Sequence, residues 1–219
     1  MWQFLSAGGP FMILLLATSI VGVTFIIERG LALRRRMVVP QELERALARC
    51  HGREDLPSLR DACMQQPSSL ARIVLAAIEQ LPFPRTDNAE AVETRARHEV
   101  QLLERGLVVL EIVVGISPLL GLVGTVHGLI TLFGDLGAAG MSDNSVLARG
   151  ISIALNTTLA GLLIAIPSLI AWSYYSRRVE TFAVQMETQL DDFLRRQYRR
   201  PLAGGSAVPR DAAGVVSEA

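Results

Sequence analysis

Three long stretches without a charged residue constrain the fold of this chain more than any other feature. They are residues 1–27, 112–134 and 150–176. Each exceeds the roughly 20 residues that a helix needs to cross about 30 Å of hydrocarbon. The alternative, buried helices of a soluble core, is disfavoured because too little of the chain remains to cover three such helices. The sequence therefore predicts an all-α integral membrane protein with three transmembrane helices per subunit.

The first apolar stretch has an alternative interpretation as a cleaved signal peptide. Such a peptide carries its basic residues before the apolar run and a cleavage site of small residues after it. Here the order is reversed, because MWQFLSAGGP has no basic residue and ERGLALRRR follows the run. We therefore expect a retained helix with its N-terminus outside.

The layout of the arginines predicts the orientation of the helices. All 21 basic residues are arginine, 13 of them between residues 29 and 105 and seven from residue 177 onward. Basic residues close to the ends of a span favour the cytoplasmic side. The segment between the first two spans and the C-terminus are therefore expected in the cytoplasm, and the short second loop is expected outside.

Composition and periodicity divide the chain into seven segments. The predicted segments are an N-terminal part with transmembrane helix 1 (1–35), a cytoplasmic helical region (36–105), transmembrane helix 2 (106–135), an external loop (136–148), transmembrane helix 3 (149–176), a cytoplasmic C-terminal helix (177–200) and a disordered tail (201–219). A helix starting near Asn88 has no Gly or Pro before Gly106, so we expect it to run directly into the second span. An apolar stripe is expected on the C-terminal helix at Val179, Phe182, Met186, Leu190 and Phe193.

Several features have an ordinary structural role. Cys50 and Cys63 fall in the cytoplasmic segment, where thiols stay reduced, and with His51 they lack a metal-ligand spacing. The sequence has no recognisable nucleophile–base set, Walker loop or dinucleotide fingerprint. The arginine runs lie at helix ends, where they indicate membrane lipid rather than nucleic acid. We therefore expect neither an enzyme nor a cofactor nor a bound metal.

Small residues line one face of the second and third spans. Gly121, Thr125 and Gly128 share a face of the second span, which also contains Pro118. Small residues at such spacing let helix backbones approach closely, so this face is predicted to be packed or to line a cavity. A matching face of the third span contains Ile151, Ala154, Thr158, Gly161 and Ala165. Pro167 is expected to kink that helix near its cytoplasmic end.

Polar residues in the middle of the third span leave two interpretations open. Asn156, Thr157 and Thr158 are adjacent, and Thr125 matches them in the second span. Such side chains can join helices through hydrogen bonds that average about 0.6 kcal/mol. Alternatively, hydroxyls and amides can relay protons through water or coordinate a small cation. A cluster favours the ion pathway, because a buried Asn is costly unless something bonds it.

These spans resemble a known family. PLLGLVGTVHG at residues 118–128, followed by GISIALNTTLAGLLIAIPSL, is similar to the paired signature of the MotA/TolQ/ExbB proton channel family, and the first span is similar to its ExbB branch. The resemblance implies a homopentamer in the bacterial inner membrane, with a periplasmic N-terminus and spans two and three around a pore. It also implies a dimer of ExbD- or TolR-like single-span helices in that pore, and a TonB- or TolA-like protein that receives the mechanical work. The glycine faces, which we expect a lone three-helix subunit to leave unsatisfied, agree with a pentamer.

The resemblance also assigns roles to residues. Thr125 and Thr158 match the two threonines of the family's ion route, and the partner helix supplies an essential aspartate. Where the family usually has a glutamate in the third span, this chain has Ile153. Asn156 and Thr157 are expected to compensate for that carboxylate. Further assignments are Glu111 as an exit carboxylate or a surface charge, and His127 as a structural or interfacial residue.

Three functions follow from these observations. The leading one is an ion channel subunit, for protons in the first instance, of an ExbB/TolQ-type energy-transducing complex. The second is a rotary stator like MotA, disfavoured because MotA-like chains have four spans. The third is a non-conducting membrane scaffold, suggested by Ile153.

Overall fold

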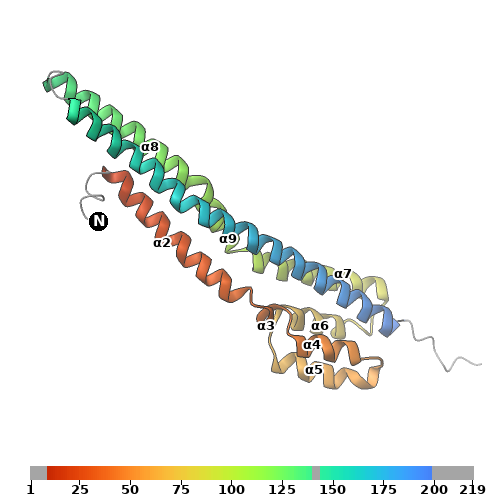
Figure 1. Ribbon diagram of the computed structural model, residues 1–219. Helices are drawn as coiled ribbons and strands as arrows, with labels where there is room; N and C mark the ends of the chain where they lie inside the picture. The colour runs from red at the N-terminus through yellow and green to blue at the C-terminus, as the bar shows by residue number, and fades with distance from the viewer. Residues whose placement is uncertain (1–8, 140–143, 199–219) are drawn as a thin grey trace, which may run out of the picture.

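The computed structural model describes residues 9–139 and 144–198, and every regular element in these ranges is a helix (Figure 1). The elements are α2 (Gly9–Ala32), α3 (Arg35–Val38), α4 (Gln41–Arg49), the 3-10 turn η1 (Arg53–Asp55), α5 (Leu56–Gln65), α6 (Ser69–Glu79), α7 (Arg85–Glu104), α8 (Leu107–Ala139) and α9 (Asn144–Tyr198). Parts of α2, α8 and α9 are long and apolar enough to cross a membrane. The predicted all-α class with three such helices is confirmed. The predicted tail, 201–219, lies outside the described residues.

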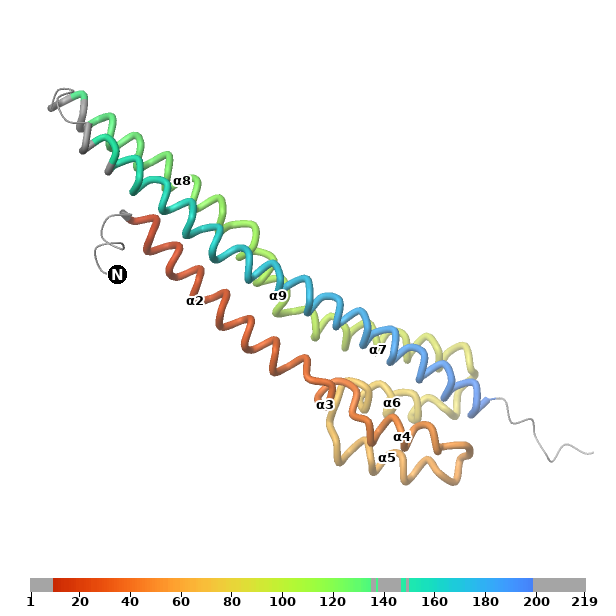
Figure 2. The backbone as a smooth tube through the Cα atoms, viewed as in Figure 1, coloured from red at the N-terminus to blue at the C-terminus, as the bar shows by residue number. Residues whose placement is uncertain are grey.

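Helices α8 and α9 form a long antiparallel hairpin, and α2 lies along it (Figures 1 and 2). The contact between α8 and α9 is the most extensive of any pair of elements in the described ranges. Both helices continue without interruption through a proline, Pro118 in α8 and Pro167 in α9. Proline is tolerated in membrane helices because neighbouring groups satisfy the freed carbonyl.

Helix α9 is much longer than a membrane crossing. At 55 residues, and about 1.5 Å per residue, it is roughly 80 Å long. Its apolar part ends at Ser176, and Arg177 and Arg178 follow directly. The remaining turns carry the predicted apolar stripe, whose five members are all buried. That prediction is confirmed. Helix α9 therefore joins the apolar bundle of α2, α8 and α9 to the polar half of the molecule, which consists of α3 to α7 and the last turns of α9.

The expected continuity between α7 and α8 is wrong, because the helix is interrupted at Arg105 and Gly106. Arg29, near the end of α2, reaches this junction and donates a hydrogen bond from Nη1 to the Leu103 carbonyl at 3.2 Å. A Cβ atom at Gly106 would overlap the Arg29 side chain. The break coincides with Gly106, a residue type that disfavours a helix interior, and with a contact from a side chain 74 positions away.

The polar half of the molecule has its own hydrophobic core. Residues of α4, α5 and α6 pack against α7 and against the last turns of α9 around Phe193, which is fully buried. Cys50 and Cys63 are free thiols inside this core. Burial raises the pKa of both thiols, that of Cys63 to about 11. In the described ranges, no three His, Cys, Asp or Glu side chains are grouped to hold a metal ion.

One carboxylate is buried within this half. Glu99 of α7 is inaccessible to solvent and accepts hydrogen bonds from Arg72 of α6, at 2.8 Å from Nε and 2.5 Å from Nη2. Arg95 lies 3.1 Å from the same carboxylate. Burial raises the pKa of Glu99, but the bonds from Arg72, its charge, and the charge of Arg95 outweigh that effect and hold the pKa below its usual value. This cluster ties α6 to α7.

Candidate functional site

Glycines bring the backbones of α8 and α9 into direct contact. A Cβ atom at Gly161 would lie 2.5 Å from the Ser117 carbonyl oxygen and 3.2 Å from the Cα of Gly121. At Gly121 it would lie 2.9 Å from the Thr157 carbonyl oxygen, and at Gly128 it would lie 3.2 Å from the Cβ of Ala154. These separations leave little or no space for a larger residue. The two small-residue faces are therefore packed against each other in one subunit.

This packing corrects one expectation from the sequence. The glycine faces were expected to remain unsatisfied in a lone three-helix subunit, yet each of the two is covered by the other. The reason is that α8 and α9 form a hairpin with their small faces turned inward, which the sequence does not specify. The surfaces left for other subunits or lipid are the opposite faces, which carry long apolar side chains.

The close approach of the backbones brings Thr125 of α8 against Thr158 of α9. Their hydroxyl oxygens form a short hydrogen bond in which either atom can donate. The Thr125 hydroxyl also lies 3.0 Å from the Ala154 carbonyl oxygen and 3.1 Å from that of Gly121. The Thr158 hydroxyl lies 3.1 Å from the Gly121 carbonyl oxygen. The two threonines that the family resemblance singled out thus form one polar pair.

The pair has more acceptors than protons, so its hydrogen bonds have two arrangements. A threonine hydroxyl carries one proton and two lone pairs. In one arrangement Thr158 donates to Thr125, which donates to a carbonyl. In the other, Thr125 donates to Thr158, which donates to the Gly121 carbonyl. Rotation of two hydroxyls interconverts the arrangements, and this reversal is what a proton relay through hydroxyls requires. Both side chains are half-buried, so neither is sealed from the surroundings.

The three adjacent polar residues of α9 have three different surroundings. Thr157 is buried and donates to the Ala154 carbonyl at 2.6 Å, next to Gly124 of α8. Thr158 belongs to the pair with Thr125. Asn156 is half-buried and makes no side-chain hydrogen bond within the described ranges. Thr158 therefore has the bonds expected of a residue that joins helices, Thr157 bonds within its own helix, and Asn156 has no side-chain hydrogen bond in the part of the chain that the structure describes.

The other residues selected from the sequence are spread along the hairpin. Ile153 is half-buried, one turn from Thr157. Glu111 is exposed, near the end of α8 that joins α7. His127 is exposed, and its ring meets the ring of Phe11 edge-on at 5.3 Å between centroids. Pro118 is half-buried and Pro167 is exposed. These residues do not join the threonine pair into a single cluster.

Two serines were missed by the sequence reasoning. Ser117 of α8 and Ser168 of α9 are buried and donate to the carbonyls four residues earlier, at 2.6 Å and 2.8 Å. A Cβ atom at Gly22 of α2 would lie 3.3 Å from the Ser168 hydroxyl and 3.2 Å from Val113. They could have been found as hydroxyl residues inside apolar spans. Because each bonds its own helix, they act in packing where the three long helices meet.

Long apolar side chains cover the outer faces of the hairpin. Between 50% and 66% of each is exposed in the single chain: Leu119, Leu122, Val126 and Ile130 on α8, and Leu155, Leu159, Leu163 and Ile166 on α9. An apolar surface of this extent fits lipid or further subunits rather than water.

Fold and site together define a class of protein: an all-α membrane protein in which a glycine-packed hairpin holds a pair of hydroxyl groups. The chain belongs to the MotA/TolQ/ExbB proton channel family, whose sequence pattern matches residues 65–188. That range includes both threonines. The family is one of channels and not of enzymes.

Individual relatives are ExbB-like proteins. An ExbB-like biopolymer transport protein of Synechocystis is 34% identical over 190 residues, covering 80% of this chain and 72% of the relative. A second one from the same organism is 32% identical over 212 residues, covering 89% of this chain and 95% of the relative. The biopolymer transport protein ExbB of Helicobacter pylori is 36% identical over 81 residues, which are 37% of this chain and 56% of that protein.

Proposed function

We propose that this chain is the ion channel subunit of an ExbB/TolQ-type complex in a bacterial inner membrane. The complex would use a proton gradient to do mechanical work on a partner in the cell envelope. The observation that carries this proposal is the Thr125–Thr158 pair, placed between two apolar helices of a channel-family protein. Its two hydrogen-bond arrangements suit a step that passes a proton to and from an acid on another chain.

The proposed assembly is a homopentamer with α8 and α9 around a central pore. Its support is the exposed apolar surface on both helices, which a single chain leaves uncovered. A dimer of an ExbD- or TolR-like single-span protein would occupy the pore and supply the aspartate that meets the threonine pair. A TonB- or TolA-like protein is proposed as the recipient of the work. In this arrangement the N-terminus and residues 136–148 face the periplasm, and the polar half and the C-terminus face the cytoplasm.

Polar residues near the pair are proposed to replace the carboxylate that Ile153 lacks. Asn156 is the best candidate, because it is half-buried and its amide has no bond within the described ranges. Its amide can hold a water molecule or bond a partner helix. Glu111, exposed at the end of the hairpin next to the polar half, is proposed to receive ions that leave the pore.

A non-conducting scaffold is the second candidate function. The observation that favours it is the bonding of Thr125, Thr157 and Thr158 to carbonyls of their own subunit. If these hydroxyls only join helices, replacing them should slightly weaken folding and assembly and change nothing else. The channel proposal expects the opposite pattern, namely normal assembly and lost ion flux.

The composition of the native complex tests the proposed function. The chain would carry an affinity tag at its chromosomal locus, and the complex would be purified in a mild detergent for native mass spectrometry. We expect five copies of this chain with two copies of a single-span protein that has an aspartate in its span. A homo-oligomer without any such protein would favour the scaffold. Monomers in every mild detergent tried would contradict the pentamer.

A further inference from the structure

A basic pocket lies where the apolar helices give way to the polar half of the molecule. It has a volume of about 320 Å³ and lies between α3 and α9. Its lining consists of Arg35, Tyr174, Arg177, Arg178, Thr181, Phe182 and Gln185. Three arginines and no acidic residue are thus among the described residues that line it. The ion pathway proposed above uses none of these groups.

One arginine of the pocket lies against two aromatic rings. The Arg178 guanidinium lies 5.6 Å from the centre of the Phe182 ring and 6.0 Å from that of Tyr174. It also donates a hydrogen bond to the Tyr174 hydroxyl at 2.9 Å. These contacts are all with uncharged groups, so they orient the guanidinium without neutralising it. A planar guanidinium held in this way is suited to bind a phosphate through two N–H groups.

The charge of the pocket is largely uncompensated. No carboxylate forms a salt bridge with Arg177 or Arg178 within the described ranges. Arg35 does pair with Glu44, at 3.1 Å, on the side of α4. The pocket therefore has two free positive charges and a third that is shared. An anion is the ligand that this arrangement favours.

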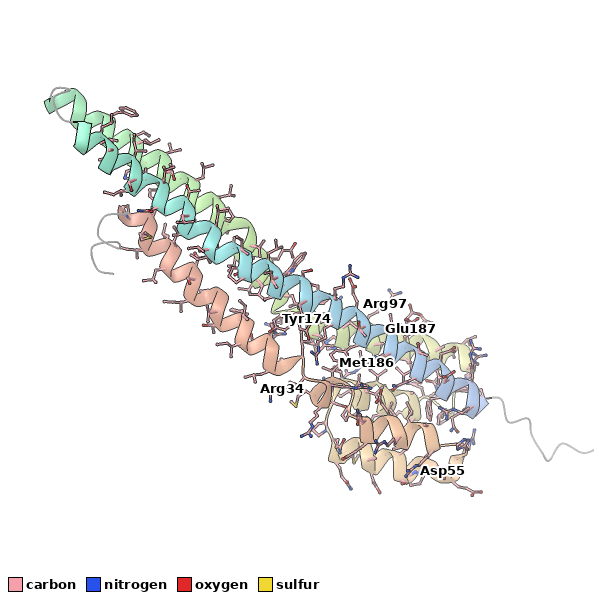
Figure 3. All side chains as sticks on the ribbon, in the orientation of Figure 1. Arg34, Asp55, Arg97, Tyr174, Met186 and Glu187 are labelled. Carbon is pink, nitrogen blue, oxygen red and sulfur yellow. The ribbon has the colours of Figure 1, made fainter. Side chains whose placement is uncertain are left out.

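The position of the pocket, at the end of the apolar spans, indicates which kind of anion it binds. Tyr175, next to Tyr174, donates to the Ile26 carbonyl at 3.1 Å, so the last turns of α2 lie beside this part of α9. Figure 3 shows Tyr174 and Arg34 at the same end of the apolar bundle. Apolar side chains on the bundle side of this level are exposed, among them Ile27 and Leu31 of α2 and Ile170 of α9. Tyrosine and arginine at the boundary of an apolar span are typical of the headgroup layer.

We propose that this pocket binds the phosphate of an anionic phospholipid, whose acyl chains lie along the exposed apolar surfaces of α2 and α9. Arg177 and Arg178 would bind the phosphate, and Tyr174 would orient Arg178. The site would fix the depth of α9 in the membrane at the point where its apolar span meets the polar half. This proposal goes beyond ion conduction and holds whether or not the complex conducts.

The test compares two pairs of arginine substitutions. Arg177→Gln with Arg178→Gln removes two charges from the pocket, and Arg34→Gln with Arg36→Gln removes two charges near the same membrane level that do not line it. The purified full-length complex would be titrated with phosphatidylglycerol or phosphatidylcholine, and bound lipid counted by native mass spectrometry. Each pocket arginine would lose a charge-assisted hydrogen bond to the phosphate, which contributes about tenfold or more in affinity, so we expect phosphatidylglycerol binding to fall roughly a hundredfold in the pocket pair. A clearly smaller loss is expected in the control pair.

Further variants and ligands distinguish a phosphate site from diffuse attraction and from a subunit interface. Arg178→Lys keeps the charge but loses the planar group, so we expect an intermediate loss. Equal losses in the two double variants would overturn the pocket in favour of diffuse attraction to the membrane surface. Binding of inorganic phosphate as tight as that of phosphatidylglycerol, or equal binding of phosphatidylcholine, would also contradict the proposal. Dissociation of the complex in the pocket pair, with lipid still bound to its subunits, would instead assign the arginines to a subunit interface.

Discussion

At the scale of single residues, a hydroxyl inside hydrocarbon needs an acceptor, and the chain provides acceptors through its glycines. Gly121 and Gly161 let the two backbones touch, which puts carbonyl oxygens of both helices next to Thr125 and Thr158. Bulkier residues at these glycines would separate the helices and remove the acceptors that each hydroxyl finds on the opposite helix. The stability of the hairpin and the chemistry of its threonine pair therefore depend on the same close packing.

A glycine-to-alanine pair tests this dependence. Gly161→Ala introduces a methyl group 2.5 Å from the Ser117 carbonyl oxygen, which is backbone and cannot move aside. Overpacking of this kind costs about 1–3 kcal/mol, so the thermal unfolding midpoint in detergent should fall. Gly115→Ala is the matched control, because nothing lies within 4 Å of the new methyl group. Its midpoint should stay the same or rise, since alanine favours a helix. An unchanged midpoint for Gly161→Ala would show that the backbones are not in contact.

The same residues show what sequence patterns can and cannot predict. The small face of each helix follows from spacing at three and four residues, and the structure has both faces packed. The partner of each residue does not follow, because the sequence does not specify how α8 and α9 are aligned. Asn156, Thr157 and Thr158 looked like one cluster, but successive helix positions point about 100° apart. Their side chains therefore lie in different surroundings.

At the scale of elements, contacts between residues far apart in the sequence accompany features that local helix propensity does not predict. Arg29 of α2 contacts the break between α7 and α8, and Arg72 of α6 pairs with the buried Glu99. The apolar stripe of α9 was predictable because all five residues lie on one face at helical spacing. The burial of Glu99 was not, since α7 is rich in charged residues and one acid among many has no distinguishing pattern.

The Glu99 cluster predicts how stability depends on pH. Its folded pKa is lowered from the ordinary 4.5, so its stabilising contribution is complete above that value. The contribution is lost as the pH falls through the folded pKa. Unfolding midpoints of the wild type should therefore decline between pH 5 and pH 3 more steeply than those of Glu99→Gln. Equal slopes for the two proteins would contradict this role.

Removing Arg72, which donates two hydrogen bonds to Glu99, should destabilise the protein more than Glu99→Gln does. Arg72→Met leaves the carboxylate buried with only Arg95, and breaking a buried ion pair costs about 3–5 kcal/mol. Because the Arg72 side chain is 42% exposed, water screens part of this interaction, and the lower end of that range is expected. Glu99→Gln leaves two partly exposed arginines that water can solvate, so its cost at pH 7 should be smaller. Unfolding midpoints of the two variants at pH 7 provide the comparison.

At the scale of the whole molecule, the arginines predict which end of the bundle faces the cytoplasm. The native cysteines are poor probes of this orientation, because both are buried and burial raises their pKa. Exposed positions serve better: Met64→Cys in the polar half and Gly137→Cys at the far end of α8, in a background with both native cysteines replaced by serine or alanine. A membrane-impermeant thiol reagent should label only Gly137→Cys in intact cells, and both after permeabilisation. Labelling of Met64→Cys in intact cells would reverse the orientation.

The proposed function depends on whether the threonine pair carries ions through the assembled complex. The most direct measurement is proton flux into liposomes that contain the native complex, purified with its own partner, under an imposed membrane potential and with a pH-sensitive dye inside. Thr125→Val with Thr158→Val keeps the shape and removes both hydroxyls, and Thr125→Ser with Thr158→Ser keeps the hydroxyls. We predict flux in the wild type and the serine pair, and at least a tenfold loss in the valine pair at normal complex yield. Flux in the valine pair equal to that of the wild type would contradict the account.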